Sequence, residues 1–332
     1  MAGGFRGVLL FVIGDLDYMA KTLSLPRWSK QDSPCALCQC KKHGAASYFD
    51  NRYPGAGWLD TLWDFYSWKR WGQRSKCHLF SLSWMSALNV AYDWMHAKYL
   101  GSDQYIYGSC MFLLVYHILP GSPQQNLDIL WRWMKSYYKK HKPRVRYNSF
   151  CKLTMFKRKK DFPKLRGKAA EVKAFGPVLL EMWGQFSSKR DTQHKQIKLL
   201  LKKNVKVDQT LASHPTSEYY RLPEGVHEEF VSDCFAVAQI HKQLGEWYSK
   251  QENPIRIFNM TAKSHCVLHI ALAAEFVHPG LTWCYSGEDF MRVVQVLLQS
   301  CVRGNQPFAT MNKACKHYNL GSQLRWAKEA KK

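Results

Sequence analysis

The sequence predicts an α/β protein that is mostly helical, and three observations support this fold class. The run Val8–Ile13 is continuously apolar and partly β-branched, which is typical of a fully buried strand. Most of the chain after residue 58 places apolar residues at helical spacing. Apolar residues make up 46% of the 332 residues, with 13 Trp, 17 Tyr and 17 Phe, which favours a substantial packed core over disorder.

The predicted elements begin with one strand and continue as helices. The strand ends at Gly14-Asp15, and a short helix follows at 16–23. A tight cysteine turn covers 34–40, and the Gly, Pro and Asn content of 44–57 predicts a loop. Helical patterns then cover residues 58–119, 127–138, 168–186, 196–201, 226–249, 263–276 and 288–301.

The order of these elements predicts three parts of the chain. Residues 1–43 carry the strand with its terminal acid and the cysteine turn. Residues 44–260 form a large helical insertion, which contains a basic linker near 139–160. Residues 261–332 return to the strand as helices, and the sequence contains no internal repeat.

The charge of the chain is strongly positive and clustered. Its 48 Lys and Arg exceed its 25 Asp and Glu, which gives a formal net charge of +23. Clustered cations on this scale are typical of proteins that bind nucleic-acid phosphates. The same runs are typical of nuclear-localisation signals, and a solvated linker is the structural alternative. The candidate nucleic-acid-binding residues are Lys139, Lys140, Lys142, Arg144, Arg146, Lys157, Arg158, Lys159 and Lys160.

Cysteine usage and hydropathy argue against disulfide-stapled and membrane-spanning proteins. The 11 cysteines are odd in number and form no regular framework, which favours a reducing compartment. The run Val8–Ile13 is too short for most signal peptides, and acidic residues follow it at once. The longest other apolar stretch, Cys110–Leu119, contains His117 and cannot span a bilayer. We therefore expect no membrane insertion.

Two separated motifs predict one structural zinc site. Cys35-x2-Cys38 is a turn that places two thiolates on one metal, but two ligands do not complete a site. His265 and His269 are four residues apart in a helical pattern, so their side chains share one helix face. Together the two motifs supply Cys2His2, a complete tetrahedral set for Zn²⁺. Such a metal would join the two ends of the helical insertion.

Simpler interpretations of each half stay open. Cys40 and His43 lie close to the cysteine turn, so a local site of Cys35, Cys38, Cys40 and His43 is an alternative. Free buried cysteines would explain the turn without a metal, and a pair of surface histidines would explain the helical motif.

Two acidic positions suggest a second kind of metal chemistry. Asp15 ends the predicted strand, a position where carboxylates of nucleases commonly hold divalent metals such as Mg²⁺. Asp17 is a neighbouring alternative, and the structural alternative is that Asp15 caps the helix that follows. Ser286 and Asp289 fit a capping box that places Glu288 in the first turn of a helix, and a plain helix start is the alternative.

Taken in order along the chain, these motifs resemble the CACTA (En/Spm-like) family of DDE transposases. The resemblance covers residues 7–300 in islands, and it departs from the family where Asp17-Tyr18 replaces Pro-Ala and Asp289 replaces Arg. Its five motifs are the strand end Ile13–Tyr18, the turn Pro34–Cys38, the segment Asp93–His96, the pair His265 and His269, and the segment Trp283–Met291.

The resemblance implies an RNase H-like core that is interrupted by the helical insertion. It assigns Asp15 and Glu288 as the second and third of three catalytic acids that hold Mg²⁺. The family's first acid lies on a strand that would precede Met1, so we expect the cleavage activity of this chain to be impaired. Asp93 and His96 match a family motif to which we assign no role.

Three hypotheses of function follow from these inferences. The first is a nuclear, transposase-derived DNA-binding protein whose Mg²⁺-dependent strand cleavage and transfer is impaired. The second is a non-catalytic, zinc-stabilised basic protein that binds nucleic acid with a steep dependence on salt. The third is an RNA-binding scaffold that prefers single strands. Self-association is compatible with each of them.

Overall fold

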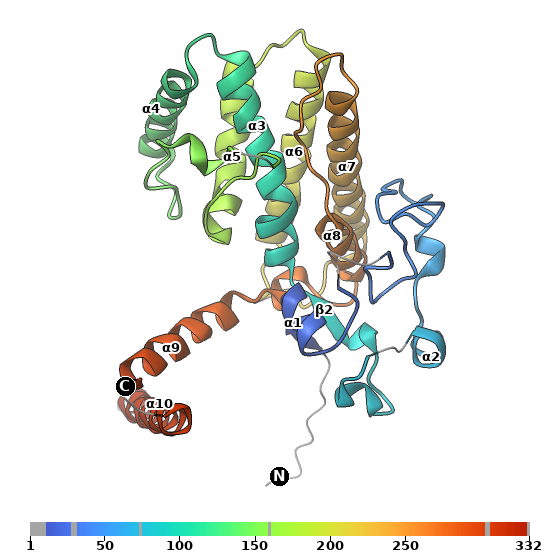
Figure 1. Ribbon diagram of the computed structural model, residues 1–332, viewed down its shortest axis with the longest axis vertical. Helices are drawn as coiled ribbons and strands as arrows, with labels where there is room; N and C mark the ends of the chain where they lie inside the picture. The colour runs from blue at the N-terminus through green and yellow to red at the C-terminus, as the bar shows by residue number, and fades with distance from the viewer. Residues whose placement is uncertain (1–10, 28–31, 73–74, 159–160, 303–305, 331–332) are drawn as a thin grey trace. The chain divides into compact units, whose positions relative to one another are not determined.

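The chain folds into a mostly helical structure, as the sequence predicts. The computed structural model describes residues 11–27, 32–72, 75–158, 161–302 and 306–330 (Figure 1). The chain divides into two compact units, Met1–Trp283 and Cys284–Lys332. The boundaries predicted near residues 43 and 260 follow changes of sequence pattern and stay predictions. None of the helices in the described ranges combines the length and the apolarity that crossing a bilayer requires.

The first unit contains two short strands and a set of helices. The strands are β1 (Val12–Gly14) and β2 (Val90–Tyr92). The α-helices are α1 (Leu16–Lys21), α2 (Phe65–Ser67), α3 (Asp103–Leu113), α4 (Pro123–His141), α5 (Ala169–Phe186), α6 (Thr192–Ser213), α7 (Glu224–Ser249) and α8 (Ala262–Ala273). Short 3₁₀ turns are η2 (Leu59–Thr61), η4 (His78–Ser81), η5 (Ala87–Asn89), η8 (Leu153–Met155) and η9 (Pro279–Thr282). Turns with π-helical bonding are η3 (Trp68–Gly72), η6 (Met95–Ser102) and η7 (Leu114–Ile118).

The second unit consists of the helices α9 (Tyr285–Cys301) and α10 (Pro307–Glu329), which pack on each other. The capping box predicted at Ser286 is wrong in register. Because α9 begins at Tyr285, Ser286 already lies inside the helix and Cys284 occupies the N-cap position. The side chains of Ser286, Glu288 and Asp289 lie outside the described part of the structure.

The two strands form a small parallel sheet. At the carboxyl end of the sheet Gly14 pairs with Tyr92, and at the other end Val12 pairs with Val90. The prediction of a fully buried strand is wrong for its described residues, since Ile13 is 41% exposed. Among the described residues β1 has a neighbour on one side only, which leaves part of it open to solvent. Residues 8–10 of the predicted strand lie outside the described ranges.

The helical pattern predicted over 58–119 is correct only in its second half. The described residues of 58–92 form short helical turns and the strand β2, which the sequence did not indicate. Ser86 and Asn89 explain the break, because the Ser86 hydroxyl accepts from Leu88 N over 3.1 Å while the Asn89 side chain accepts from Ser86 N over 2.9 Å. These local bonds close a single turn and release Val90 into the strand.

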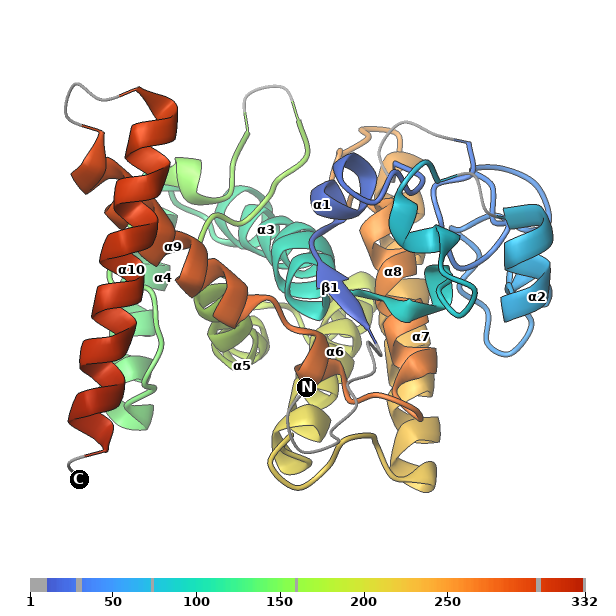
Figure 2. The same cartoon turned by 90° about the horizontal axis from the view of Figure 1, so that it is seen from below.

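The sheet lies at one end of a bundle of long helices. α6 packs on both α5 and α7, and α3 packs on α5. Their apolar faces enclose a core that includes Tyr107, Phe175, Trp183, Leu200 and Leu244, all of them buried. Figures 1 and 2 place α1 and the strands beside the ends of α3 and α8. The bundle therefore provides the rigid support on which the strand ends are positioned.

A buried charge network connects the start of α3 with α6. The Lys98 ammonium donates to Asp103 over 2.7 Å and to Asp208 over 3.3 Å. Tyr99 donates its hydroxyl to Asp208 over 2.8 Å, and Asn204 donates to Asp103 over 3.0 Å. Burial disfavours the charge on Lys98, but the two carboxylates outweigh this effect and raise the pKa of Lys98. Burial also raises the pKa of Asp103 to about 6, although Lys98 opposes that rise.

Replacing Lys98→Met tests whether this network stabilises the fold. The change leaves the buried Asp103 and the half-buried Asp208 carboxylates without their cation, so we expect the free energy of unfolding to fall by about 3–5 kcal/mol in urea titrations near pH 8. Between about pH 4 and 6 the folded state binds protons more tightly at Asp103 than the unfolded state does, so this carboxylate destabilises the fold increasingly as pH rises. The loss caused by Lys98→Met should therefore be smaller at pH 5 than at pH 8. Lys202→Met, at an exposed site on α6, is the matched control, and an equal effect of both substitutions would contradict this role of the network.

Candidate metal centre

Backbone pairing with a second loop holds the cysteine turn in place. Cys38 forms an isolated antiparallel bridge with Leu62. Leu37 is held on both sides, because its N–H donates to the Cys35 sulfur over 3.3 Å and its carbonyl accepts from Trp63 N over 3.0 Å. The turn thus has a defined shape before any metal is considered.

Helix α8, near the C-terminal end of the first unit in the sequence, supplies the histidines. His265 and His269 lie one turn apart on this helix, and their Nε2 atoms are 3.0 Å apart. Both are buried, so the interpretation of two surface histidines is wrong. The rings of Trp58 and His265 pack in a T-shaped arrangement at 4.4 Å between centroids, and the Trp58 ring also lies 4.9 Å from that of His269. The indole therefore closes one side of the site.

The cysteine turn and α8 meet, although the contacting residues are 227 positions apart in the sequence. The Cys38 sulfur lies 3.3 Å from His265 Nε2, and the Cys35 sulfur lies 3.3 Å from His269 Nε2. In a tetrahedral zinc site, bonds of about 2.3 Å to sulfur and 2.0 Å to nitrogen put such ligands roughly 3.5 Å apart. The observed separations match this geometry, so the two predicted halves form one site.

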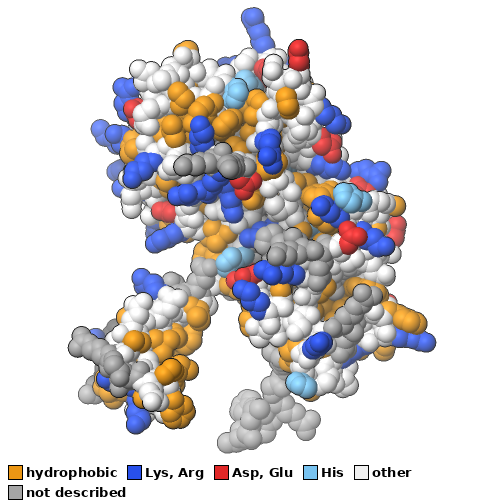
Figure 3. All heavy atoms as spheres, in the orientation of Figure 1, with side chains coloured by type: hydrophobic (Ala, Val, Ile, Leu, Met, Phe, Trp, Pro, Cys, Tyr) orange, Lys and Arg blue, Asp and Glu red, His pale blue; other side chains and the backbone are white. Residues whose placement is uncertain are grey.

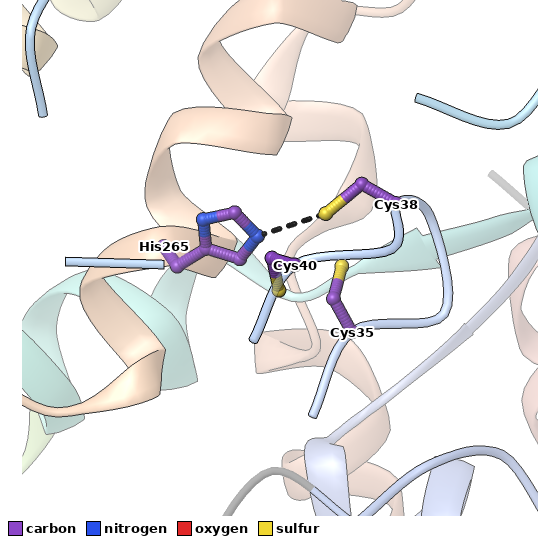
Figure 4. A group of neighbouring side chains, drawn as sticks. All are labelled: Cys35, Cys38, Cys40 and His265. Carbon is purple, nitrogen blue, oxygen red and sulfur yellow. Dashed lines mark hydrogen bonds between the residues drawn. The ribbon is translucent and has the colours of Figure 1, made fainter. Parts of the chain in front are cut away.

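Cys40 enlarges this site to five candidate ligands. The donor atoms of Cys35, Cys38, Cys40 and His265 all lie within 4.8 Å of one another, and Figure 4 shows these four side chains pointing toward a common centre. The set differs from the predicted one by Cys40 in place of His269. His43, the other alternative, is exposed on the loop. The sequence signal for Cys40 was its position two residues after Cys38, which made it an alternative ligand but did not reveal where its sulfur would lie.

The protonation of the cluster suits a divalent cation. Burial disfavours ionisation of Cys35, but hydrogen bonds from the thiols of Cys38 and Cys40 outweigh it and hold the pKa of Cys35 well below its ordinary value. The same contacts with Cys35 raise the pKa of Cys38 and of Cys40. Burial lowers the pKa of His265, which keeps its imidazole neutral as a ligand must be. A doubly charged metal would stabilise all three thiolates together, and this buried Cys3His cluster has the donor set of a closed structural zinc site.

Tyr92 links the metal centre to the sheet. Its hydroxyl accepts from Ala36 N over 3.1 Å and lies 3.6 Å from the Cys35 sulfur. Tyr92 is also the last residue of β2, opposite Gly14. The position of the cysteine turn and that of the strand ends are therefore coupled through one buried ring.

Asp15 and Asp93 follow directly after the paired ends of the two parallel strands. Asp15 caps α1, since its carboxylate accepts from Tyr18 N over 2.6 Å, which is the structural alternative considered for this residue. Asp93 is only 3% exposed, accepts from Met95 N over 2.9 Å and pairs with His96 Nδ1. The carboxyl ends of adjacent parallel strands thus carry two acids side by side, and the role of Asp93 was not apparent from the sequence.

The remaining predicted residues fall in two other places. Glu288 belongs to α9 of the second unit, and its side chain is outside the described structure. Lys159 and Lys160 also lie outside the described residues. Arg158 is half-buried, and the other basic residues of the two runs are exposed, namely Lys139, Lys140, Lys142, Arg144, Arg146 and Lys157.

We expect one zinc ion per purified chain. Cys38→Ser and His265→Ala should each lose the metal and lower the free energy of unfolding by several kcal/mol, because structural zinc binding contributes about 10–16 kcal/mol to folding in small metal domains. Metal content by mass spectrometry and urea unfolding measure the two effects. Purified protein that contains no zinc would contradict the assignment.

The fourth ligand is identified by comparing Cys40→Ser with His269→Ala. The compact set predicts that Cys40→Ser loses zinc and that His269→Ala retains it. The matched controls are the exposed residues Cys151→Ser and His43→Ala, which should leave the metal content unchanged. Zinc retained by Cys40→Ser and lost by His269→Ala would restore the Cys2His2 set.

Comparisons of the chain with protein-family models, with curated proteins and with solved structures return no match.

Proposed function

We propose that this chain is a zinc-stabilised nuclear protein that binds duplex DNA through a basic segment, defined as residues 132–168. The observation that carries the proposal is the charge of this segment, which has fifteen Lys and Arg and a single acid, Asp161. Six of the predicted phosphate contacts in it are exposed. Lys and Arg side chains are frequent on the face of the molecule drawn in Figure 3, where acidic side chains are sparse. Such a field attracts polyanions and binds them by release of counterions.

The aromatic rings near the basic segment favour a duplex over a single strand. Proteins that bind single strands offer uncovered rings on which bases stack. Here several rings have a cation over one face, which leaves less ring surface for bases. These pairs are Lys135 with Trp131, Arg146 with Tyr138, Lys157 with Tyr116, and Lys164 with Tyr105. Contacts to phosphates, which the cations make without base stacking, are then the main source of affinity.

The metal centre supports the fold in this proposal. Its donors are buried and four of them complete the coordination of zinc, so no position is left for substrate or water. The proposal also includes descent from a transposase. In that case β1 and β2 are parallel strands that remain from an RNase H-like core.

A second candidate function is Mg²⁺-dependent cleavage of DNA, favoured by one specific observation. Asp15 and Asp93 follow the carboxyl ends of adjacent parallel strands, the position at which acids of phosphodiester-cleaving sites hold metal ions. The contacts of Asp15 with Tyr18 and of Asp93 with His96 would have to rearrange when Mg²⁺ binds.

DNA binding is tested by fluorescence anisotropy with a 20-base-pair duplex at several salt concentrations. A variant with Lys139, Lys140, Arg144 and Arg146 all changed to Gln should bind at least ~10-fold more weakly, and its slope of log affinity against log salt should decrease by about 0.9 for each lost phosphate contact. The control changes the exposed Lys195, Lys198 and Lys202 of α6 to Gln. Equal losses in the two variants, or tighter binding of a single-stranded RNA of the same length, would contradict the proposal.

Cleavage is tested with supercoiled plasmid and Mg²⁺. If the second candidate is correct, Asp15→Asn and Asp93→Asn each abolish nicking, because a carboxylate that holds the metal is lost. Asn is as good an N-cap as Asp, so Asp15→Asn should keep α1 folded. Asp17→Asn is the matched control, since Asp17 pairs with Lys21 on the exposed side of α1. Nicking that survives in both variants would exclude these acids.

A further inference from the structure

A cavity of about 420 Å³ lies where the C-terminal end of α7 meets the segment 255–260 and the basic segment. Its size is within the range of small-ligand pockets in proteins, which is roughly 300–1,000 Å³. Phe162 of the basic segment and Phe49 both line the cavity, and both residues are half-buried. The cavity therefore offers aromatic surface to a ligand beside the part of the chain that is proposed to bind DNA.

Phe258 gives the cavity a fixed backbone wall. Its φ of 53° lies in the left-handed region, which is strained for a residue other than glycine. Two contacts hold this conformation. The Phe258 N–H donates to the buried Ser109 hydroxyl of α3 over 2.7 Å, and Gly245 of α7 lies so close that an added Cβ would be 2.8 Å from Phe258 O. Strained backbone of this kind is concentrated at binding and active sites, so we consider the cavity a candidate ligand site.

The lining of the cavity has a net positive charge. It contains the cations Lys242 and Arg256 and a single acid, Glu246. Lys242 and Glu246 pair along α7, with 3.8 Å between their charged atoms, so the charge that remains is that of Arg256. The Arg256 guanidinium lies over the Phe162 ring, 4.9 Å from its centre. A flat, neutral ring that carries a phosphate matches this lining, because the ring stacks on phenylalanine while the phosphate pairs with arginine.

We infer that this cavity binds one unpaired base of a DNA duplex whose backbone is held by the basic segment. The inference rests on the proposed DNA binding and names the form of DNA that the chain prefers. Every base has a π-face, so stacking recognises an unpaired position and not a sequence. Taking a base out of an intact duplex costs at least as much free energy as one stacking contact returns. The favoured occupant is therefore a base that is already unpaired, as in a bulge.

The test compares a fully paired duplex with the same duplex carrying a single bulged adenine, in anisotropy titrations of the full zinc-containing chain. The wild-type chain should bind the bulged duplex about 10-fold more tightly, the order of effect that one stacked base has. Phe162→Ala should remove this preference but change the affinity for the paired duplex by less than ~2-fold, because every cation is kept. Tyr66→Ala removes a ring that is 82% exposed and does not line the cavity, so this matched control should keep the preference.

A second variant keeps the test independent of folding defects. Ser249 lines the cavity at the exposed end of α7, so Ser249→Phe should fill the cavity and remove the preference while zinc content and thermal unfolding stay unchanged. Equal affinities of the wild-type chain for the two duplexes, or a preference that persists in both variants, would overturn the base site while leaving DNA binding intact. Wild-type chain that binds neither duplex would instead overturn the proposed function, and this site with it. Free deoxyadenosine monophosphate that competes as strongly as the bulged duplex would overturn DNA as the source of the base.

Discussion

The first unit depends on one contact, the convergence of the cysteine turn and helix α8 on a common centre. The turn has little regular structure of its own, and β1 and β2 contribute only three residues each. What fixes them is a set of buried donors from both sides, together with the hydroxyl of Tyr92, which contacts the turn and ends β2. A metal here contributes free energy that a two-stranded sheet cannot supply by itself.

In the proposed function, structural support and DNA recognition belong to different parts of the chain. The zinc centre is enclosed, whereas the basic segment is largely exposed and bears the charge.

Much of the fold was predictable where the signal is local. The long helices follow apolar periodicity, and the pairing of Cys35 and Cys38 with His265 follows from ligand counting. The strand β2 was missed because three residues are too few to show a period. Cys40 was only an alternative ligand in the sequence analysis, because sequence spacing does not show where a sulfur points. The burial of β1 was overestimated, since composition does not reveal how many neighbours a strand has. The position of Asp93 next to Asp15 follows only from the parallel register of β1 and β2, which no local sequence pattern encodes.

The sequence separation between the cysteine turn and α8 has a consequence for biosynthesis. The three cysteines leave the ribosome early, but His265 is translated 227 residues after Cys38. Bringing them together closes a very long loop, whose entropic cost is met only when the helices between them have already packed. Until then the nascent chain presents reduced thiols and an incomplete donor set, to which any soft metal ion or oxidant has access. Correct metal loading therefore belongs to the last stage of folding, and during synthesis the chain relies on its surroundings to keep these thiols reduced.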